Sequence, residues 1–423
     1  MTAATGPLSH LRVLDLGIIT AGAASSQVFA DFGADVIKVE STTYTDPFRN
    51  WTQIAAGPTD GTQPLQSPPF ASVNRNKRGI AIDLKTEAGR KVFLDLVAQS
   101  DLVVENFRRG VLDRLGIGFD ALKQANPRIV LLSLSSQGLD GPEKGYVSFG
   151  STLDGLGGVM ALTGYDEQNP LWSGSNVNYP DQLVSFLAPG LALAGLRLRD
   201  TTGEAVHVDA AQREAVTSGV GETVLEYSRT GTVTGPLGNR HPEFAPQGVY
   251  PSLGKDEWVA VSVTDDAQWR ALCDVLDLPE AQADPRFTTA SGRQTHHDEL
   301  DQLIGERTRA HDKEALAADL QRCGVPASAV LVAHEVLVDD QLKALAFHQS
   351  VPGDPIVQRG MAFRLDRTPG TIRKPAPRLG EDTREVLTQI LGLTEDRITA
   401  LVREGAVFVG EEQSTAAAVP TTA

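Results

Sequence analysis

The first third of the chain alternates short apolar runs with stretches of helical periodicity. The apolar runs predict strands over LRVLDL (11–16), DVIKVE (35–40), GIAIDL (79–84), DLVVENF (101–107) and IVLLSLS (129–135). Apolar residues follow helical spacing in GAASSQVFADFG (22–33) and in EAGRKVFLDLVAQS (87–100). Strands that alternate with helices in this way predict an α/β fold built on a mainly parallel sheet.

The pattern changes after residue 150. Residues 150–200 have the periodicity of glycine-rich helices, and LVSFLAPGLALAGL (183–196) predicts a kinked, buried helix that is too short to span a bilayer. The segment RTGTVTGPLGNR (229–240) has the composition of a linker. Beyond it, GVYPSLGKDEWVAVSV (248–263) predicts a hairpin that turns at Gly254, with helices expected at 266–276, 298–309 and 313–322. These elements would form an α+β module of their own.

The composition of the chain bears on its binding partners and on its cellular location. The formal net charge is -16, which disfavours nonspecific binding to nucleic acid or to anionic membranes. The two cysteines stand alone, so neither a disulfide framework nor a metal cluster is expected. The first residues lack the pattern of a signal peptide, and a cytoplasmic location is therefore expected.

The stretch LGIITAGAASSQ (16–27) joins the first predicted strand to the first helix, as a nucleotide-binding loop does. A dinucleotide fingerprint needs three glycines at fixed offsets, whereas this loop has Gly17 and Gly22. Glu40 ends the next strand where a ribose-binding acid would stand, but a solvated charge at a strand end explains it equally well. The loop indicates Rossmann-like topology and leaves the ligand open.

Several stretches together resemble the class III CoA-transferase family, which includes carnitine dehydratase, bile-acid-inducible and formyl-CoA transferase-like proteins. They are LRVLDLGIITAGAASSQVFADFGADVIKVE, NRNKRGIAIDLKTEAGR, DLVVENFRRGVLDRLGIGFDALKQANPRIVLLSLSSQGLDGP, GNRHPEFAPQGVYP and RTPGTIRKPAPRLGEDT, and they follow the family's order from about residue 10 to 410. The resemblance implies a Rossmann-like large domain, an inserted smaller α+β domain, and two chains interlocked in a homodimer. We expect residues 1–225 to form the N-terminal part of the large domain and 226–328 the small domain. Residues 329–410 would return to the large domain, and 411–423 would be a disordered tail.

The resemblance also implies the chemistry. Members of the class III family move CoA from an acyl-CoA thioester to a free carboxylic acid through a covalent aspartyl intermediate, with acyl-CoA as substrate and no metal. The acid that fits is Asp181, although related sequences place it two residues closer to the glycine that corresponds to Gly174. Asp181 also stands where a helix N-cap would, and the two roles are compatible. Asp154 is the rival acid, and Thr20 is expected to contact the acyl intermediate.

An acidic protein that binds CoA must gather positive charge where the phosphates dock. The resemblance implies that Asn106, Phe107 and Arg114 line this site, with Phe107 stacking on adenine and Arg114 pairing with phosphate. The full set of residues expected there is Gly22, Asn76, Lys77, Arg78, Asn106, Phe107, Arg114 and Lys144. Two basic groups stand out in the sequence: Arg75, Lys77 and Arg78 in NRNKR, and Arg108, Arg109 and Arg114 in ENFRRGVLDR. Without the resemblance, solvated surface charges would account for either group alone.

Two other functions are weighed against CoA transfer. Related enzymes with the same fold epimerise 2-methylacyl-CoA esters with a histidine, but Phe149 occupies the corresponding position and cannot exchange a proton. A catalytically silent CoA-binding protein is the third alternative.

Overall fold

The structure is a computed structural model that describes residues 6–51, 67–166, 168–173, 177–351 and 354–410 of the 423-residue chain. The predicted tail, 411–423, and Gly174 lie outside the described residues. The chain forms two compact units. The larger contains residues 1–159, 173–221 and 343–423, and the smaller contains 160–172 and 222–342. The sequence-based range for the small domain, 226–328, falls within the second of these stretches.

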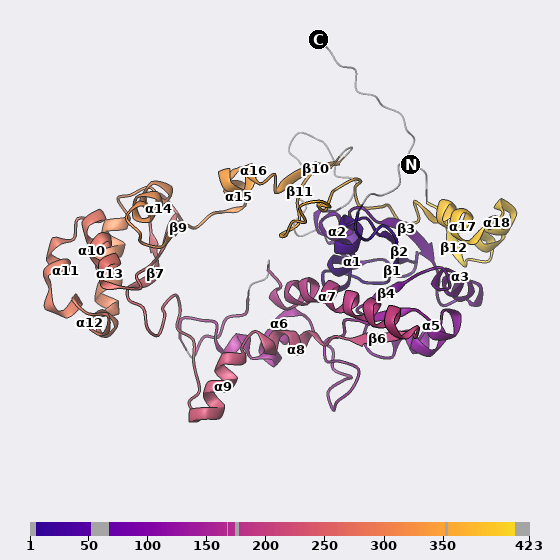
Figure 1. Cartoon of the computed structure of the whole chain (residues 1–423), viewed down its shortest axis with the longest axis horizontal. Helices are drawn as coiled ribbons and strands as arrows, with labels where there is room; N and C mark the ends of the chain where they lie inside the picture. Colours follow the sequence, from indigo (N-terminus) through magenta and orange to yellow (C-terminus); the bar gives the residue numbers. More distant parts are fainter. Residues whose placement is uncertain (1–5, 52–66, 167, 174–176, 352–353, 411–423) are drawn as a thin grey trace, which may run out of the picture. The chain divides into compact units, whose positions relative to one another are not determined.

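A seven-stranded sheet forms the centre of the large unit (Figure 1). Its order is β12-β3-β2-β1-β4-β5-β6, and all neighbours are parallel except β12, which runs antiparallel to β3. The strands are β1 (Arg12–Asp15), β2 (Asp35–Glu40), β3 (Arg78–Ile82), β4 (Leu102–Glu105), β5 (Val130–Ser133), β6 (Val206–Asp209) and β12 (Val407–Phe408). The order 3-2-1-4-5-6 is that of the doubly wound Rossmann fold, so the α/β prediction is confirmed.

Helices cover both faces of this sheet. The helical segments that precede residue 220 are α1 (Ala21–Asp31), η1 (Pro47–Asn50), α2 (Pro68–Asn74), α3 (Glu87–Val97), α4 (Val111–Arg114), α5 (Phe119–Ala125), α6 (Gly150–Gly157), η3 (Val159–Ala161), α7 (Tyr179–Thr202) and α8 (Gln212–Ser218). Near the C-terminus, α17 (Thr383–Leu391) and α18 (Glu395–Arg403) precede β12. The α3 helix begins where the Thr86 hydroxyl caps it, accepting from the Gly89 N–H at 2.9 Å.

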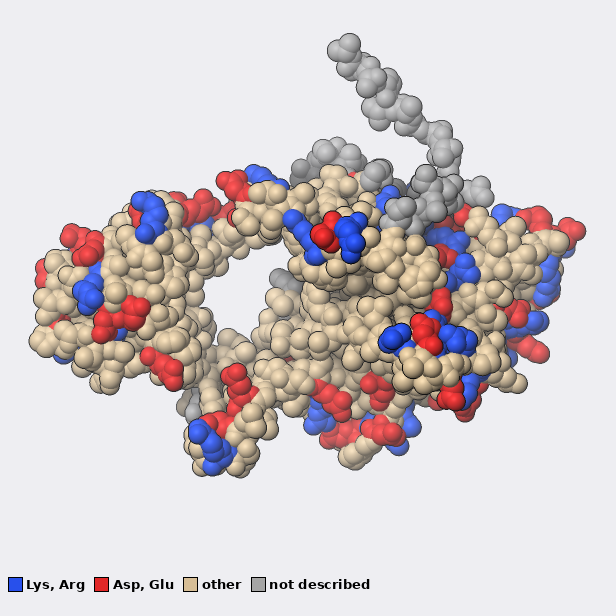
Figure 2. Space-filling view, viewed as in Figure 1, with Lys and Arg blue, Asp and Glu red and all other residues tan. Residues whose placement is uncertain are grey.

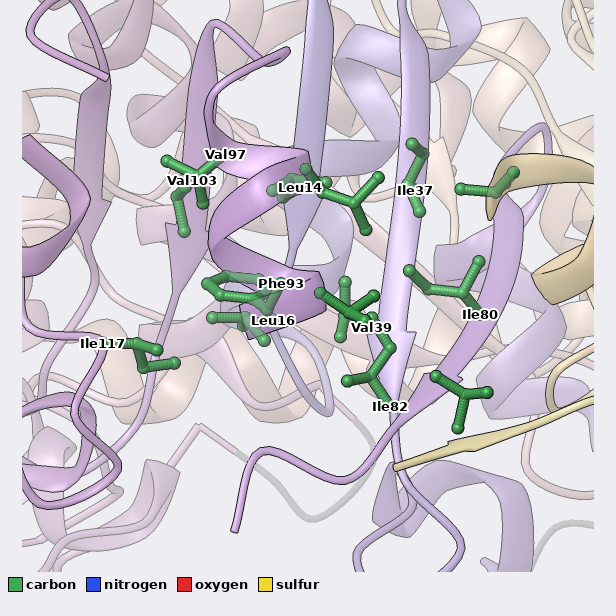
Figure 3. Close-up of a cluster of buried hydrophobic side chains, with 14 of the residues drawn as sticks. Leu14, Leu16, Ile37, Val39, Ile80, Ile82, Phe93, Val97, Val103 and Ile117 are labelled. Atoms are coloured by element: carbon green, nitrogen blue, oxygen red, sulfur yellow. The ribbon is translucent and has the colours of Figure 1, made fainter. Parts of the chain in front are cut away.

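The strand pleat sends alternate side chains into two hydrophobic cores. Val13 of β1 packs with α1 and α7 on one face, whereas Leu14 packs with α3, α5, α17 and α18 on the other. Figure 3 shows the second core, in which Phe93 and Val97 of α3 lie against side chains of the strands. Burial on both faces explains why these strands are continuously apolar in sequence.

The α7 helix is longer and less buried than its sequence predicts. It extends over Tyr179–Thr202 with Pro189 inside it, and Val184, Ala188 and Ala192 on one face are buried. Other side chains of the helix are exposed, including Phe186, Leu187 and Leu191. The expectation of a buried helix therefore holds for part of its surface only, because a run of apolar residues does not say which face meets the core. Among the described residues, no helix is long and apolar enough to cross a membrane.

The small unit has its own core. A three-stranded antiparallel sheet of order β7-β8-β9 contains β7 (Gln247–Pro251), β8 (Trp258–Ser262) and β9 (Ala327–Ala329). The predicted hairpin is confirmed, and Gly254 in its turn has φ of +119°. Helical segments here are α9 (Gly221–Thr230), α10 (Asp266–Val275), α11 (Pro279–Ala283), η4 (Pro285–Phe287), α12 (Ala290–Thr295), α13 (His297–Thr308), α14 (Lys313–Arg322) and α15 (Ala333–Val338). Trp269, Leu272 and Leu300 are among the side chains buried between sheet and helices.

The chain then continues through α16 (Asp340–Ala344) and an antiparallel pair, β10 (His348–Val351) and β11 (Asp354–Arg359). The predicted arm, 367–383, is irregular and lies against the large unit. Its Thr371 N–H donates to the Asp31 carbonyl at 3.0 Å, and its Lys374 carbonyl accepts from the Asn76 N–H at 3.1 Å. Figure 2 shows acidic and basic side chains intermixed on the face drawn there.

Candidate active site

The strand order reverses between β1 and β4, and the loops at the carboxyl ends of these two strands contact each other. In doubly wound folds this is the position where ligands bind. Asn106, directly after β4, accepts a hydrogen bond from the Ile18 N–H at 2.7 Å and donates to the Ile18 carbonyl at 3.0 Å. A Cβ at Gly22 would lie 2.5 Å from the Gly17 Cα and 2.6 Å from the Asn106 Oδ1. Gly22 is thus required by packing within the protein itself.

Thr20 lies at the end of this loop, directly before α1. Thr20 is 5% exposed, and its carbonyl accepts a hydrogen bond from the Ala24 N–H at 2.8 Å. The residue before it, Ile19, has φ of +56°. That conformation is rare for a β-branched residue, and such strain is concentrated at functional sites in proteins.

Glu40 is neither solvated nor available to a ribose. It is 6% exposed, and the Arg49 guanidinium donates to its two oxygens, with Nη2 at 2.6 Å from Oε2 and Nε at 2.9 Å from Oε1. The Asp46 N–H donates to Glu40 Oε1 at 2.9 Å. Both sequence-based interpretations of Glu40 are therefore corrected, because a partner nine residues away occupies the carboxylate.

Asp181 lies in the first turn of α7 and is partly buried. Its Oδ1 accepts from the Gln212 Nε2 at 3.0 Å, and its Oδ2 accepts from the Asn178 Nδ2. Burial raises the pKa of Asp181, and the two amide donors oppose the rise. The helix N-cap is Asn178, so Asp181 is not the cap that its position in the sequence suggested.

Asp154 supports the approach to α7. It is 0% exposed, and its Oδ2 accepts from both the N–H and the hydroxyl of Ser173, at 3.0 and 2.8 Å. The Ser173 hydroxyl in turn accepts from the Tyr179 N–H at 3.3 Å. These contacts give Asp154 a structural role at the start of the helix that carries Asp181.

Phe107 and Arg114 lie beyond β4. The Phe107 N–H donates to Glu105 at 2.8 Å, and its ring meets Tyr44 edge-on at a centroid distance of 6.3 Å. Burial raises the pKa of Glu105 to about 7. Arg114 is exposed at the end of α4. Within the described part of the chain, its guanidinium forms no hydrogen bond or ion pair, so it is available to an anion.

Lys144 is also exposed and lines a surface cavity of about 570 Å³. The Arg108 guanidinium donates to the Gly145 carbonyl at 2.5 Å, which joins the loop after β4 to the segment that carries Lys144. Arg213 on the cavity wall is paired with Glu143. The loop that carries Asn106 and Phe107 therefore contacts the loop that carries Lys144.

The residues 76–78 are engaged inside the protein. Asn76 donates to Asp31 at 2.7 Å, and Arg78 pairs with Asp35 at the amino end of β2. The Lys77 ammonium donates to Asp15, to the Ala23 carbonyl and to Asn74, all at 2.7 to 2.8 Å. Burial lowers the pKa of Lys77 to about 8, and Asp15 opposes the change. A role for these three residues in CoA binding finds no support in their contacts.

Sequence reasoning missed Asn178 and Gln212, which hold the Asp181 carboxylate. It also missed Lys38 and Asp46, whose buried ion pair reaches the loop after β1 through the Ile19 N–H. Lys38 offered a signal, because a lysine inside the apolar strand DVIKVE must be buried and paired. Asn178 precedes Asp181 by three residues, which is one helical turn. Gln212 and Asp46 come from segments whose positions only the folded chain reveals. Among the described residues, no group of three His, Cys, Asp or Glu gathers as a metal site.

Comparison with known proteins decides the family. The model of CoA-transferase family III matches residues 8–383. This chain belongs to CoA-transferase family III. It is 35% identical to the succinyl-CoA–D-citramalate CoA-transferase of Chloroflexus aurantiacus, over 93% of this chain and 96% of that protein. It is 30% identical to the succinate–glutarate CoA-transferase of Agrobacterium fabrum, over 91% and 96% of the two chains.

Solved structures agree with this assignment. A CAIB/BAIF family protein from Brucella suis superposes with a TM-score of 0.84 at 29% identity, covering 91% of this chain and 99% of that one. A further relative, the acetyl-CoA:oxalate CoA-transferase of Acetobacter aceti, is 31% identical over 77% of this chain and 81% of its own length. The protein is therefore a family III CoA-transferase whose substrates include an acyl-CoA thioester.

Proposed function

We propose that this family III CoA-transferase moves CoA between two carboxylic acids through a covalent intermediate on Asp181. The observation that carries the proposal is the setting of this carboxylate. Two neutral amide groups, from Asn178 and Gln212, hold its oxygens at the N-terminus of a 24-residue helix. Neutral donors orient a nucleophile without an ion pair that would hold it in its ground state.

The exchange proceeds in steps that conserve the thioester's energy. An Asp181 oxygen attacks the acyl-CoA carbonyl, the C–S bond breaks, and the thiolate leaves with the electron pair to give a mixed anhydride. The thiolate then attacks the Asp181 carbonyl carbon, which releases the donor acid as its carboxylate and forms an aspartyl thioester. The acceptor carboxylate displaces the thiolate, and the thiolate attacks the acceptor carbonyl. The products are the new acyl-CoA and free Asp181.

The N-terminus of α7 favours this chemistry. The positive end of its dipole stabilises an ionised carboxylate and the oxyanions that form at it. In the proposal, Thr20 contacts the acyl group from the loop after β1. Phe107 stacks on adenine, and Arg114 and Lys144 bind phosphate. Asn106 fixes the loop after β1 through the backbone of Ile18.

We infer that at least one of the two exchanged acids is dicarboxylic. The relatives are named for succinyl-CoA with D-citramalate, for succinate with glutarate, and for acetyl-CoA with oxalate, and each pair contains a dicarboxylic acid. We also propose that two chains act as an interlocked homodimer in the cytoplasm. Exposed apolar side chains support a partner chain: Phe186, Leu187, Leu191 and Leu193 of α7 and Val224, Leu225 and Tyr227 of α9.

Asp181→Ala tests the proposal. With succinyl-CoA and a panel of free dicarboxylic and aromatic acids, we expect loss of exchange on the order of 10⁴-fold, with CoA binding retained. Hydroxylamine added during turnover should label position 181 in the wild type. Asp154→Asn serves as the control for the rival acid. Full exchange by Asp181→Ala, or labelling at another side chain, would show that the assignment is wrong.

The same assay separates the other two candidates. Inversion at C2 of a 2-methylacyl-CoA without CoA exchange would indicate an epimerase, although Phe149 offers no proton-transfer group. Binding without either reaction would indicate a silent CoA-binding protein.

A further inference from the structure

Side chains hold the backbone N–H and carbonyl groups of Gly17 and Ile18 in the loop between β1 and α1. In chain order, Asp15 accepts from the Gly17 N–H and Lys38 donates to the Gly17 carbonyl. Asn106 binds both the N–H and the carbonyl of Ile18. The conformation of this loop is therefore set by these side chains in place of a regular backbone ladder.

Asp46 continues the series at the strained residue. Its Oδ1 accepts from the Ile19 N–H at 3.1 Å and from the Phe48 N–H at 3.0 Å, while its Oδ2 pairs with the Lys38 ammonium at 2.9 Å. Lys38 thus links the Gly17 carbonyl to the carboxylate that binds Ile19. Ile19, whose φ is in the left-handed region, therefore follows a carbonyl held by Lys38 and has its own N–H held by Asp46.

The ion pair is fully removed from water, with both side chains 0% exposed. Burial acts to lower the pKa of Lys38, but Asp46, Asp15 and Glu40 outweigh it and raise the pKa, so the ammonium stays charged. Burial acts to raise the pKa of Asp46, but Lys38 and the N–H donors outweigh it and lower the pKa. A hydrophobic pair of similar size would stabilise the fold about as well, so stability alone does not explain this one.

We propose that Lys38 and Asp46 are positioning residues for CoA transfer, because their ion pair holds Ile19 left-handed and thereby places Thr20 beside the acyl group. The inference rests on the proposed function of the loop. Ile19 and Thr20 are adjacent, so a change of φ at Ile19 redirects the Thr20 side chain. Loss of the ion pair should therefore affect turnover more than acyl-CoA binding.

Lys38→Met tests the proposal, since methionine has a similar shape without the charge. We expect kcat to fall about 100-fold, as an ångström-scale misplacement does, while KM for acyl-CoA changes little. Hydrogen exchange at the amides of residues 17–19 should accelerate. A second substitution, Ile19→Gly, removes the cost of a left-handed non-glycine residue and should restore kcat about tenfold in the Lys38→Met background.

Asp46→Asn provides a second route if Lys38→Met does not fold, because asparagine keeps an acceptor for the Ile19 N–H but loses the charge. It too should lower kcat, with rescue by Ile19→Gly. Arg199→Met is the matched control. Arg199 is 6% exposed and paired with Asp101 near the other end of α7, so its loss should lower stability and leave kcat unchanged.

An unchanged kcat in the Lys38 and Asp46 variants would overturn the proposal. So would a loss of kcat that follows stability alone and that Ile19→Gly fails to restore. The amide exchange measurement needs no turnover, so it tests the role in holding the loop even if Asp181→Ala remains active. Failure of the positioning role and failure of the aspartyl route are thus distinguishable.

Discussion

At the residue scale, Asp181 combines two opposing influences. Burial raises its pKa, whereas the amide groups of Asn178 and Gln212 stabilise the charged form and restrain the rise. A raised pKa makes a carboxylate a better nucleophile, but the group must still be ionised to react. The two amides therefore set the lower end of the pH range in which the proposed chemistry operates.

This balance predicts a shift of the pH profile in Gln212→Ala. Removal of a donor that lowers the pKa of Asp181 raises that pKa further, so kcat/KM should begin to fall at higher pH than in the wild type as the solution is acidified. The pH dependence of exchange from succinyl-CoA measures this. Gln294→Ala, which removes an amide from the small unit, should leave the profile unchanged. A profile in Gln212→Ala identical to the wild type would contradict the assignment of Asp181 as the titrating group.

Arg114 carries a prediction of its own, because its guanidinium is exposed. Arg114→Ala should raise KM for acyl-CoA about tenfold and alter kcat less, as the loss of a charge-assisted hydrogen bond to phosphate would. Steady-state kinetics with varied acyl-CoA measure both constants. Lys91→Ala removes an exposed cation of α3 and serves as the control. Equal KM values for Arg114→Ala and the wild type would exclude the phosphate contact.

The site residues differ in how far sequence could predict them. Asp181 could be singled out because it directly precedes an apolar helical run, and Arg114 follows a recognisable motif. The contacts of Lys77 could not be predicted, since its three acceptors come from residues 15, 23 and 74. Ion pairs between distant segments depend on the fold, which local periodicity does not encode.

At the scale of elements, the close contact between the loop after β1 and the start of α1 depends on two glycines. The Cα of Gly17 and the backbone of Gly22 approach so closely that any side chain at position 22 would force the loop or Asn106 to move. The spacing of glycines in this loop therefore reflects packing between protein segments.

Gly22→Ala should consequently destabilise the protein by about 1–3 kcal/mol, as overpacking does, and should lower kcat by moving the loop. Gly305→Ala is the matched control, because α13 also contains a glycine but a Cβ there meets its nearest atom at an ordinary 3.7 Å. That change should raise stability by about 0.5–1 kcal/mol through helix propensity. Urea denaturation measures both, and equal stabilities for the two variants would contradict the packing account.

The element predictions succeeded where burial produces a long apolar run. All five strands predicted for the first part of the chain are present. The strands β6 and β12 escaped prediction, since VHVD (206–209) contains two polar residues and β12 has two residues at the edge of the sheet. Whether such short or polar segments form strands depends more on pairing with neighbouring strands than on local sequence.

At the scale of the whole molecule, the exposed apolar face of α7 predicts a homodimer. The wild-type protein should sediment at twice the monomer mass, and Leu187→Glu should increase the monomer fraction by placing a charge in the apolar contact. Analytical ultracentrifugation measures the mass. Val402→Glu on α18 alters an exposed apolar side chain away from α7 and should leave the dimer intact. A monomeric wild type would refute the proposal.

The antiparallel pairing of β12 with β3 has a consequence for biosynthesis. The strand that closes this edge of the sheet ends at Phe408, far along the chain from β3, which ends at Ile82. Until it emerges, nascent β3 offers unpaired backbone groups to any extended peptide nearby. Completion of this sheet must therefore wait until residues 407–408 have emerged from the ribosome, whereas residues 222–342 are available for folding before then. A ribosome stalled before codon 407 would leave a chain prone to aggregate.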